Sequence, residues 1–479
     1  MLRIFLLILM LSSHSHAHNH GHAPLWQQAS GWPDRIIVNP GKDATTSFSV
    51  TWRTASHVAR SVIQLVPASA DTRFDLAAQT YKAQMEVFNL EHMQTDAGLH
   101  HSSENSLLDS VHYHSFTFEN LTPDTLYAYR VRGERGKWSE WLQTKTAATN
   151  GKLSFIYLGD SQNGVRSHWS RVIRQAYQTL PNADFFLHAG DLVSVGDSDL
   201  NWAEWFDAGG FIHRMTPAIP VRGNHENITV RNENGRKRVR TPFWRAQFTL
   251  PEEKNLSSSL QESNYMVNFA DTMTLFVIDS STKTFTEQVK WLDEALASDK
   301  AKWRVLTMHH PFFVADKFAR NKTDIKRKAA FKQLLSRHRI DLVLTGHIHT
   351  YLRGERSQQT SRTADSITTA SEIMGPVFVV SSSGAKNTNL DSDIDEYAND
   401  KNSLLQISRH AGNTPMYQAI TIEGNSLNYR AYTGVGSQYD AFTLTKSAQG
   451  NLLTEGKAAF GEQRLFTNTG KYIDWYDLR

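Results

Sequence analysis

The stretch Thr345-Gly346-His347-Ile348-His349 decides how the rest of this chain is interpreted. It follows Arg339-Ile340-Asp341-Leu342-Val343-Leu344, an apolar run that is typical of a buried strand. Gly346 allows a sharp turn at the end of this strand. One intervening residue lets the two imidazoles serve neighbouring points in space, and imidazole binds first-row transition metals well. A lone His-x-His is equally compatible with two exposed histidines, so the other strand ends decide between these interpretations.

Four more apolar segments are predicted to be strands that end in metal-binding residue types. They cover residues 153–158, 184–189, 218–222 and 303–308, and they end in Gly159-Asp160, Gly190-Asp191, Gly223-Asn224-His225-Glu226 and His309-His310-Pro311. In open α/β sheets, ligands collect at the carboxyl ends of the strands. Five clusters of Asp, Asn and His at such ends therefore predict a metal site.

This series of motifs resembles the calcineurin-like metallophosphoesterases and, within them, is most similar to the purple acid phosphatases. The resemblance implies an α/β domain over residues 151–440, a four-layer αββα sandwich in which helices flank two packed mixed sheets. The residues themselves favour an α/β domain as well, because strands alternate with helical apolar spacing. The predicted helices cover residues 167–179, 202–213, 287–297 and 325–337.

The resemblance also implies two metal ions and assigns their ligands: Asp160 and His349 on one metal, Asn224, His309 and His347 on the other, and Asp191 as the bridge between them. His310 is the neighbouring alternative to His309, but its place immediately before Pro311 matches the variable position of the family. Two divalent ions against two carboxylates leave about two positive charges, which favours a phosphate dianion as the substrate group.

His225 follows the ligand Asn224 directly. The resemblance implies that it protonates the leaving alkoxide or stabilises the transition state. The alternative is a histidine that is satisfied by Glu226 and does no chemistry. Glu226 is interpreted as a residue outside the ligand set that orients a histidine.

Two positions depart from the family pattern. Purple enzymes have a tyrosine that binds ferric iron three residues after the bridging aspartate, and Ser194 stands there in this chain. Other branches have a histidine two residues after the first aspartate, where this chain has Gln162. The first metal is therefore short of one ligand, which the side-chain oxygen of Gln162 or a water molecule would supply. The departure argues against ferric iron and predicts two divalent ions, with iron, manganese and zinc as the candidates.

The basic segment Asn232–Arg240 closely follows the Asn-His-Glu turn and is predicted to be a loop near the metals. A run of charge is often only a solvated face. Beside an anion-binding site, however, Arg236, Lys237 and Arg238 are candidates for gripping a second phosphate or a polar head group.

Residues 35–147 are predicted to form a β-sandwich before the catalytic domain. The segment Leu121-Thr122-Pro123-Asp124-Thr125-Leu126-Tyr127 resembles the tyrosine corner of fibronectin type III and related sandwiches, and Trp52 is the expected core aromatic. Purple acid phosphatases of the larger type carry such an N-terminal domain. Residues 85–110 are interpreted as an insertion between strands, without an assigned role.

Composition limits the classes of protein and of site. The chain has 479 residues and no cysteine, so thiol chemistry and disulfides are excluded. Its formal net charge of +3 provides no nucleic-acid footprint. Arg3 followed by a short apolar run predicts a signal peptide over residues 1–17, a His-rich tail and linker over 18–34, and export to the periplasm or beyond. No transmembrane segment is predicted, and residues 441–479 are expected to be a C-terminal tail.

These features together predict an exported phosphatase that resembles the acid phosphatases and hydrolyses phosphate monoesters by attack of a metal-bound hydroxide. A phosphodiesterase or nucleotide hydrolase on the same fold is the alternative, since identical ligands serve both reactions. A non-catalytic binding or adhesion protein is the alternative of a different class. The full ligand set argues against that class, because such a protein has no need of His225 beside Asn224.

Overall fold

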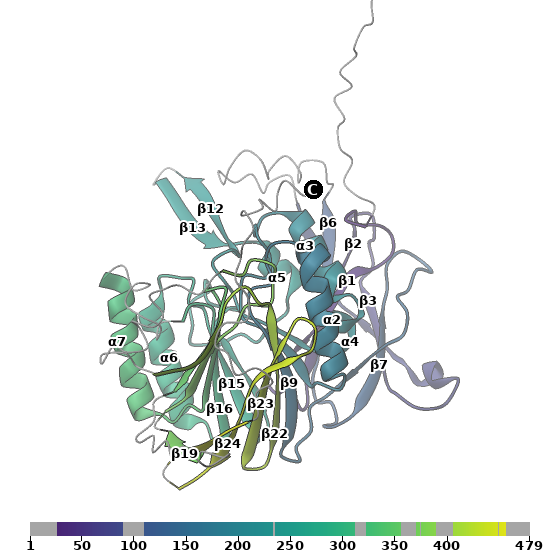
Figure 1. The fold of residues 1–479 in the computed structure, drawn as a ribbon. Helices are drawn as coiled ribbons and strands as arrows, with labels where there is room; N and C mark the ends of the chain where they lie inside the picture. The colour runs from purple at the N-terminus through teal and green to yellow at the C-terminus, as the bar shows by residue number, and fades with distance from the viewer. Residues whose placement is uncertain are drawn as a thin grey trace, which may run out of the picture.

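The computed structural model describes residues 26–89, 110–232, 235–311, 322–355, 370–373, 375–388, 406–448 and 450–456. The expected signal peptide, residues 18–25 of the His-rich tail and linker, most of the expected insertion and residues 457–479 lie outside these ranges. Within them the chain forms an N-terminal β-sandwich and a larger α/β body (Figure 1). No helix in the described ranges is both long enough and apolar enough to cross a membrane.

The N-terminal sandwich consists of two antiparallel four-stranded sheets, with the orders β1-β2-β6-β5 and β4-β3-β7-β8. Its strands are β1 (Asp34–Pro40), β2 (Phe48–Ala55), β3 (Val62–Pro67), β4 (Gln79–Lys82), β5 (Gln84–Phe88), β6 (Val111–Phe118), β7 (Leu126–Val131) and β8 (Leu142–Lys145), with the short 3-10 helix η1 (Phe74–Ala77) after β3.

The sandwich core forms where the inward faces of the two sheets meet. Trp52 is fully buried there, among side chains from both sheets. The Thr122 amide donates a hydrogen bond of 2.9 Å to the Tyr127 hydroxyl, so the predicted corner is present. The prediction that an insertion begins at residue 85 is wrong, because β5 pairs with β6 as an edge strand. The sequence Gln84–Phe88 does alternate polar and apolar residues, but Met85 and Val87 are exposed, so backbone pairing with β6 holds this short strand rather than burial of one face.

The α/β body contains two sheets packed face to face. One has eight strands in the order β11-β10-β9-β22-β23-β24-β25-β19, and the other has seven in the order β14-β15-β16-β17-β20-β18-β21. Strands β9, β10 and β11 run parallel, as do β15, β16, β17 and β20. Parallel strands place their carboxyl ends at one edge of a sheet, which is where functional residues gather in such folds.

The strands of the body are β9 (Lys152–Leu158), β10 (Phe185–His188), β11 (Ala218–Pro220), β12 (Asn227–Asn232), β13 (Gly235–Arg240), β14 (Tyr265–Phe269), β15 (Met273–Ile278), β16 (Trp303–Met308), β17 (Leu342–Thr345), β18 (Tyr351–Glu355), β19 (Ala370–Ile373), β20 (Val377–Val380), β21 (Gln406–Ala411), β22 (Met416–Glu423), β23 (Ser426–Thr433), β24 (Gln438–Lys446) and β25 (Asn451–Glu455). Its helices are the π-helix η2 (Val165–Trp169), α2 (Ser170–Thr179), α3 (Asp199–Gly209), α4 (Phe211–Met215), α5 (Phe243–Gln247), α6 (Phe285–Ser298) and α7 (Lys322–Arg337).

Helices cover both outer faces of the paired sheets, so the expected four-layer arrangement is confirmed (Figure 1). Helices α6 and α7 pack on the seven-stranded sheet through one apolar cluster, to which Leu292, Leu296 and Leu334 contribute. The spacing of four between Leu292 and Leu296 places both on one helix face. A second, larger cluster fills the space between the two sheets and extends to α2 and α3. Three of the four predicted helices occur near their expected positions, whereas the helix predicted over residues 202–213 is two helices, α3 and α4, separated at Gly210, which has a φ of 50°.

Two predictions about local structure are wrong. The expected C-terminal tail from residue 441 begins inside β24, and β24 and β25 are strands of the eight-stranded sheet. The expected loop over residues 232–240 is part of an antiparallel hairpin, β12–β13, which projects from the body (Figure 1). The second strand of this hairpin, Gly235–Arg240, is charged and lacks the usual apolar signal of a strand.

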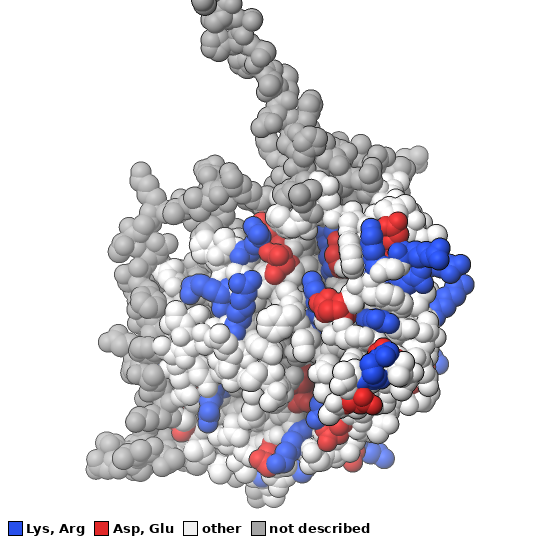
Figure 2. Space-filling model, turned by 90° about the vertical axis from the view of Figure 1, so that its right-hand side faces the viewer, with Lys and Arg blue, Asp and Glu red and all other residues white. Residues whose placement is uncertain are grey.

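The buried Arg353 connects the two sheets. It donates to Asp440 on β24 at 2.7 Å and to Glu455 on β25 at 2.8 Å. Arg353 is therefore a structural residue of the body. On the molecular face shown in Figure 2, lysines and arginines lie beside aspartates and glutamates, so neither sign of charge dominates that face.

Candidate metal centre

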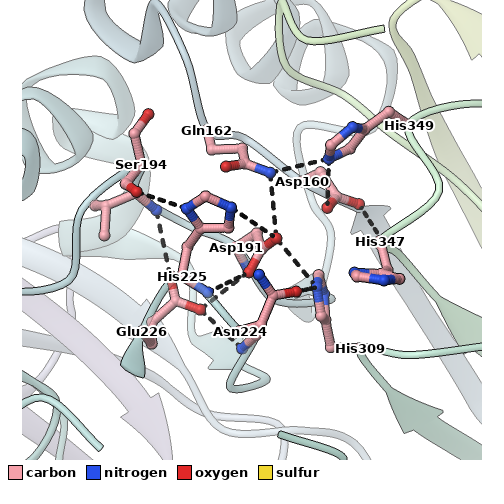
Figure 3. A network of polar contacts seen from close by, with 12 residues as sticks. Asp160, Gln162, Asp191, Ser194, Asn224, His225, Glu226, His309, His347 and His349 are labelled. Carbon is pink, nitrogen blue, oxygen red and sulfur yellow. Dashed lines mark hydrogen bonds and ion pairs between the residues drawn. The ribbon is translucent and has the colours of Figure 1, made fainter. Parts of the chain in front are cut away.

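The predicted ligands approach one another at the carboxyl ends of five strands (Figure 3). Asp160 follows β9, Asp191 follows β10, Asn224 follows β11, His309 follows β16, and His347 and His349 follow β17. Four of these residues have positive φ angles: 33° at Asp160, 51° at Asp191, 77° at His347 and 59° at His349. Such backbone is unfavourable for residues other than glycine and gathers at functional sites.

Glycines beside the ligands allow the loops to approach closely. A Cβ atom on Gly223 would lie 2.2 Å from the amide nitrogen and a carboxylate oxygen of Asp191. A Cβ atom on Gly346 would lie 2.4 Å from Oδ2 of Asp160. Both distances are far below van der Waals contact, so the Gly-Asn and Gly-His pairs of the motifs are steric requirements of the site.

Two carboxylates lie at the centre of the site, and each is only 1% exposed. Asp160, Asp191 and His309 each offer a ligand atom, and these atoms lie within 4.8 Å of one another. Oδ2 of Asp160 accepts the His347 amide at 2.8 Å, whereas its Oδ1 has no hydrogen-bond partner among the described residues. Burial raises the pKa of Asp160 well above its usual range. Burial also raises the pKa of Asp191, but the charge of His309 outweighs this effect and leaves that pKa lowered.

His309 is fully buried and held in one orientation. Its Nδ1 lies 2.9 Å from the Ala189 carbonyl, to which it donates. Its Nε2 therefore points into the site, 3.1 Å from Oδ2 of Asp191 and 3.2 Å from Oδ1 of Asn224. Burial lowers the pKa of His309, but Asp191 outweighs burial and raises it to about 10. A backbone carbonyl on the other ring nitrogen is the usual way in which proteins orient a ligating imidazole.

His347 and His349 stay neutral, which is the form of imidazole that binds metals. Burial, followed by the charge of His309, lowers the pKa of His347 to about 4. Burial, followed by the charge of Lys386, lowers the pKa of His349 to about 3. Nε2 of His349 lies 3.6 Å from the unpartnered Oδ1 of Asp160.

Gln162 lies where the first metal would lack a ligand. Its Nε2 is 3.1 Å from Oδ2 of Asp191 and 2.9 Å from Nε2 of His349, while its Oε1 is buried without a hydrogen-bond partner in the described ranges. A half turn of the amide exchanges its oxygen and nitrogen. The oxygen then points to the position shared by Asp191 and His349, as a ligand must.

Glu226 connects the two loops that carry Asp191 and Asn224. One of its oxygens accepts the amides of Asp191 at 3.0 Å and Gly223 at 2.7 Å, and the other accepts the Leu192 amide at 2.8 Å. The expectation that Glu226 orients a histidine is therefore wrong, because its described partners are backbone amides of the two ligand loops. Burial, followed by the charge of Asp191, raises the pKa of Glu226 to about 7.

His225 stands at the open side of the site, with 30% of its side chain exposed. Its Nδ1 donates to the Ser194 carbonyl at 2.6 Å. Its Nε2 points toward the ligands and lies 3.9 Å from Oδ2 of Asp191 (Figure 3). This distance leaves room for another group between the imidazole and the ligands.

Ser194 takes no part in the ligand cluster. Its hydroxyl accepts the Asn163 amide at 3.0 Å. Tyr351, the tyrosine that follows the His-x-His turn, is buried and donates its hydroxyl to Asp440 at 2.7 Å. Neither residue supplies an oxygen to the predicted metals.

Two residues beside the ligands were not assigned from the sequence. His310 places a ring nitrogen within 4.8 Å of those of His309 and His347, and its Nδ1 lies 2.9 Å from the Ser280 hydroxyl. Lys386, in the segment after β20, lowers the pKa of both His347 and His349 through its charge. Lys386 could have been found from the apolar strand at residues 377–380, which is followed by a Gly-containing turn. This strand end carries no metal-binding side chain, so it was not considered.

Arg236, Lys237 and Arg238 are exposed on β13. Arg238 reaches back to the site, where its Nη2 donates to the Asn224 carbonyl at 2.8 Å. The structure therefore brings one residue of the basic segment into contact with a candidate ligand, and places the other two farther along the hairpin.

The four-layer sandwich is the metallophosphoesterase fold, and the cluster lies at its sheet edge. The family described as calcineurin-like phosphoesterase matches residues 153–351, and the purple acid phosphatase N-terminal domain matches residues 33–146. The chain thus carries a calcineurin-like phosphoesterase domain preceded by the N-terminal domain of the purple acid phosphatases.

Individual relatives agree with this assignment. Purple acid phosphatase 21 of Arabidopsis thaliana is 26% identical over 49% of this chain and 51% of its own length. Fe(3+)-Zn(2+) purple acid phosphatase 12 of the same plant is 25% identical over 60% of this chain and 62% of its own length. The chain thus spans about half to three fifths of these relatives. The structure of purple acid phosphatase PPD1 from yellow lupin (Lupinus luteus) has a TM-score of 0.65 at 16% identity, over 87% of this chain and 75% of that one.

Proposed function

We propose that this chain is a metal-dependent phosphatase that hydrolyses phosphate monoesters at the cluster around Asp191. The observation that carries the proposal is the Oδ1 of Asp160, a buried carboxylate oxygen that lacks a hydrogen-bond partner in the described ranges and lies beside a second buried carboxylate. A buried charge without compensation is costly unless a cation or metal accompanies it. A binding protein without chemistry would gain nothing from this arrangement.

The donor set suits two divalent first-row metals. Carboxylate, amide and neutral imidazole ligands together favour manganese, iron or zinc over calcium or magnesium. We assign Asp160, His349 and Gln162 to one ion, Asn224, His309 and His347 to the other, and Asp191 to both. When bound, two such ions supply an activated water molecule and neutralise charge on the phosphoryl oxygens.

His225 is the proton donor in this proposal. Because Nδ1 donates to the Ser194 carbonyl, Nε2 carries the exchangeable proton and points into the site. From there the protonated imidazole donates to the leaving oxygen of the ester as the P–O bond breaks. Glu226 keeps the loops of Asp191 and Asn224 in register through its amide contacts, so that donor and ligands face the same phosphate.

The charge around the cluster supports a monoester over a diester. Lys386 adds a cation whose field reaches both His347 and His349. A monoester dianion gains more from this field than a diester monoanion does. A phosphodiesterase or nucleotide hydrolase on the same ligands is the alternative reaction. We also propose export of the chain, for which the apolar run after Arg3 is the support.

Asp191→Asn tests the assignment of the metals. We expect the variant to lose metal from both positions, because only Asp191 is assigned to both ions, and to lose turnover of an aryl phosphate monoester. Metal content by elemental analysis and turnover of matched monoester and diester substrates are the measurements. Retention of two metals with near-normal turnover rejects the assignment, and faster turnover of the diester by the wild-type chain favours the alternative reaction.

A further inference from the structure

The hairpin β12–β13 starts three residues after the candidate ligand Asn224 and leads away from the site. Its register pairs Arg238 with Thr229 and Arg240 with Asn227. The base of the hairpin is fixed, because Arg240 donates to the Gln261 carbonyl and Arg238 donates to the Asn224 carbonyl. The position of β13 relative to the candidate ligands is therefore set by contacts of its own side chains.

Alternation along β13 sorts its cations into two faces. Side chains two residues apart share a face of a strand, and neighbours point to opposite faces. Arg236 therefore shares the face of Arg238, which reaches toward Asn224, whereas Lys237 lies on the opposite face. Two residues of strand advance the chain by about 7 Å. The backbone of Arg236 thus lies about 7 Å farther from the site than that of Arg238, and Arg236 offers a second cation on the same face.

Among the residues that the structure describes, the cations of β13 are not paired with carboxylates in the way that other surface cations are. In the N-terminal domain, Arg73 pairs with Asp75 and Lys145 with Asp124. The face in Figure 2 shows the same mixing of signs. By contrast, among the residues that the structure describes, no carboxylate lies within ion-pair distance of Arg236, Lys237 or Arg238. A cation that is fixed beside an anion-binding site and lacks a carboxylate is suited to an anionic ligand.

We propose that the face of β13 formed by Arg236 and Arg238 binds a second phosphate of the substrate, so that the preferred substrates are phosphate monoesters that carry another phosphate. The inference rests on the proposed phosphatase function and specifies its substrate class. Arg236 contacts the distal phosphate, while Arg238 holds Asn224 and closes the near end of the subsite. Lys237 takes no part, although the sequence alone placed it among the candidates.

Arg236→Gln and Lys237→Gln form a matched pair of variants, since both remove one charge from an exposed position on the same strand. The substrates are propane-1,3-diol bisphosphate and its monophosphate, compared by kcat/KM with the metal-loaded full chain. We expect the wild-type chain to prefer the bisphosphate beyond the statistical factor of two. Arg236→Gln should reduce this preference about fivefold to tenfold, the size of one exposed charge-assisted contact, whereas Lys237→Gln should retain it.

Calorimetric binding of propane-1,3-bisphosphonate and propylphosphonate gives a readout that is independent of turnover. We expect the bisphosphonate to bind more tightly, with the same dependence on Arg236 and the same indifference to Lys237. Equal losses in the two variants would show general charge attraction and overturn the inference, as would equal binding of both phosphonates. Absence of turnover with every ester, together with the predicted binding pattern, would overturn the phosphatase proposal and leave the subsite in place.

Discussion

Ser194 is the single residue at which this site departs most from the purple enzymes it resembles. Its hydroxyl accepts the Asn163 amide, and its carbonyl orients His225. A serine hydroxyl is harder to ionise than a tyrosine and has no π-system from which charge could transfer to iron. Tyr351 cannot substitute for it in the described structure, because its hydroxyl is bound to Asp440. The first metal position that we propose therefore lacks the tyrosinate oxygen that binds ferric iron in the purple enzymes.

From this we predict a colourless protein that is active with divalent metals alone. The measurement is visible absorption as the protein is loaded with iron, manganese or zinc, with turnover recorded for each metal. Ser194→Tyr is the complementary variant and should gain a visible band with iron. A strong band in the wild-type protein that grows with its iron content contradicts the prediction.

His225→Ala separates a proton donor from a ligand. Since Nε2 of His225 lies 3.9 Å from Oδ2 of Asp191 and its Nδ1 is bound by Ser194, metal content should not change. Turnover should decrease by roughly 10²–10⁴, the usual effect of losing a general acid. The decrease should shrink for esters whose leaving group needs no proton. Loss of metal from the variant would make His225 a ligand.

Lys386→Gln tests the cation that sequence analysis missed. Its charge reaches the imidazoles of both His347 and His349, so its removal should weaken binding of a phosphate dianion. We expect KM for a monoester to rise severalfold, and the effect to fade at high salt as exposed charges are screened. Lys302→Gln is the control, because Lys302 is exposed before the start of β16 while the ligand His309 follows its end. A similar change in both variants contradicts a specific role.

Among the helices and strands, those whose buried faces give a regular spacing of apolar residues could be predicted from the sequence. Strands β9, β10, β16 and β17 are continuous apolar runs because both of their faces are covered, and turn residues mark their ends. The motifs at those ends gave the ligand candidates. The charged strand β13 gave no such signal, and the edge strand β5 gave only a five-residue alternation in which Met85 and Val87 are exposed.

Contacts between distant segments could not be predicted from the sequence either. The partners of Glu226 are backbone amides, which every residue except proline possesses, so nothing in the sequence distinguishes them. The strand β24 differs from these cases, because Phe442–Thr445 alternates buried and half-buried side chains, which is a detectable strand pattern. The structure shows that β24 and β25 are tied to the seven-stranded sheet by Arg353, which donates to both Asp440 and Glu455.

Arg353→Met measures how much β24 and β25 contribute to the body. The variant leaves Asp440 buried and without its charged partner, for which a loss of about 3–5 kcal/mol in the free energy of unfolding is expected. Denaturant unfolding is the measurement, and Arg353→Met combined with Asp440→Leu should recover part of the loss. A chain that ends at residue 440 should fail to fold. Normal stability of that shortened chain would show that the two strands are dispensable.

At the scale of the whole molecule, the N-terminal sandwich supports the site through α3. Arg35 pairs with Asp199 at 2.8 Å, and Asp199 is the first residue of α3. Asn201, on the same helix, accepts the Val195 amide at 3.1 Å and so holds the loop that carries Ser194. Ser194 in turn fixes the imidazole of His225. Contacts thus run from the sandwich through α3 to the proposed proton donor.

The stability of this assembly should depend on pH through buried histidines, and His114 of the sandwich is a clear case. Burial, followed by the charge of His112, lowers the pKa of His114 to about 4 from its ordinary value of 6.5. Between these values the unfolded chain binds a proton that the folded chain excludes. The contribution of His114 is therefore complete above pH 6.5 and is lost as the pH falls toward 4, at up to about 1.4 kcal/mol per pH unit.

His114→Gln removes this dependence. At pH 7.5 the variant should be less stable than the wild type, because the imidazole contacts the hydroxyls of Thr54 at 2.8 Å and Ser61 at 2.9 Å and stacks on Trp52. As the pH falls toward 4, only the wild-type chain loses the stability that comes from excluding this proton, so the difference between the two should narrow. Denaturant unfolding at half-unit steps of pH measures both curves. Curves that stay parallel over this range would show that His114 is protonated in the folded chain as readily as in the unfolded one.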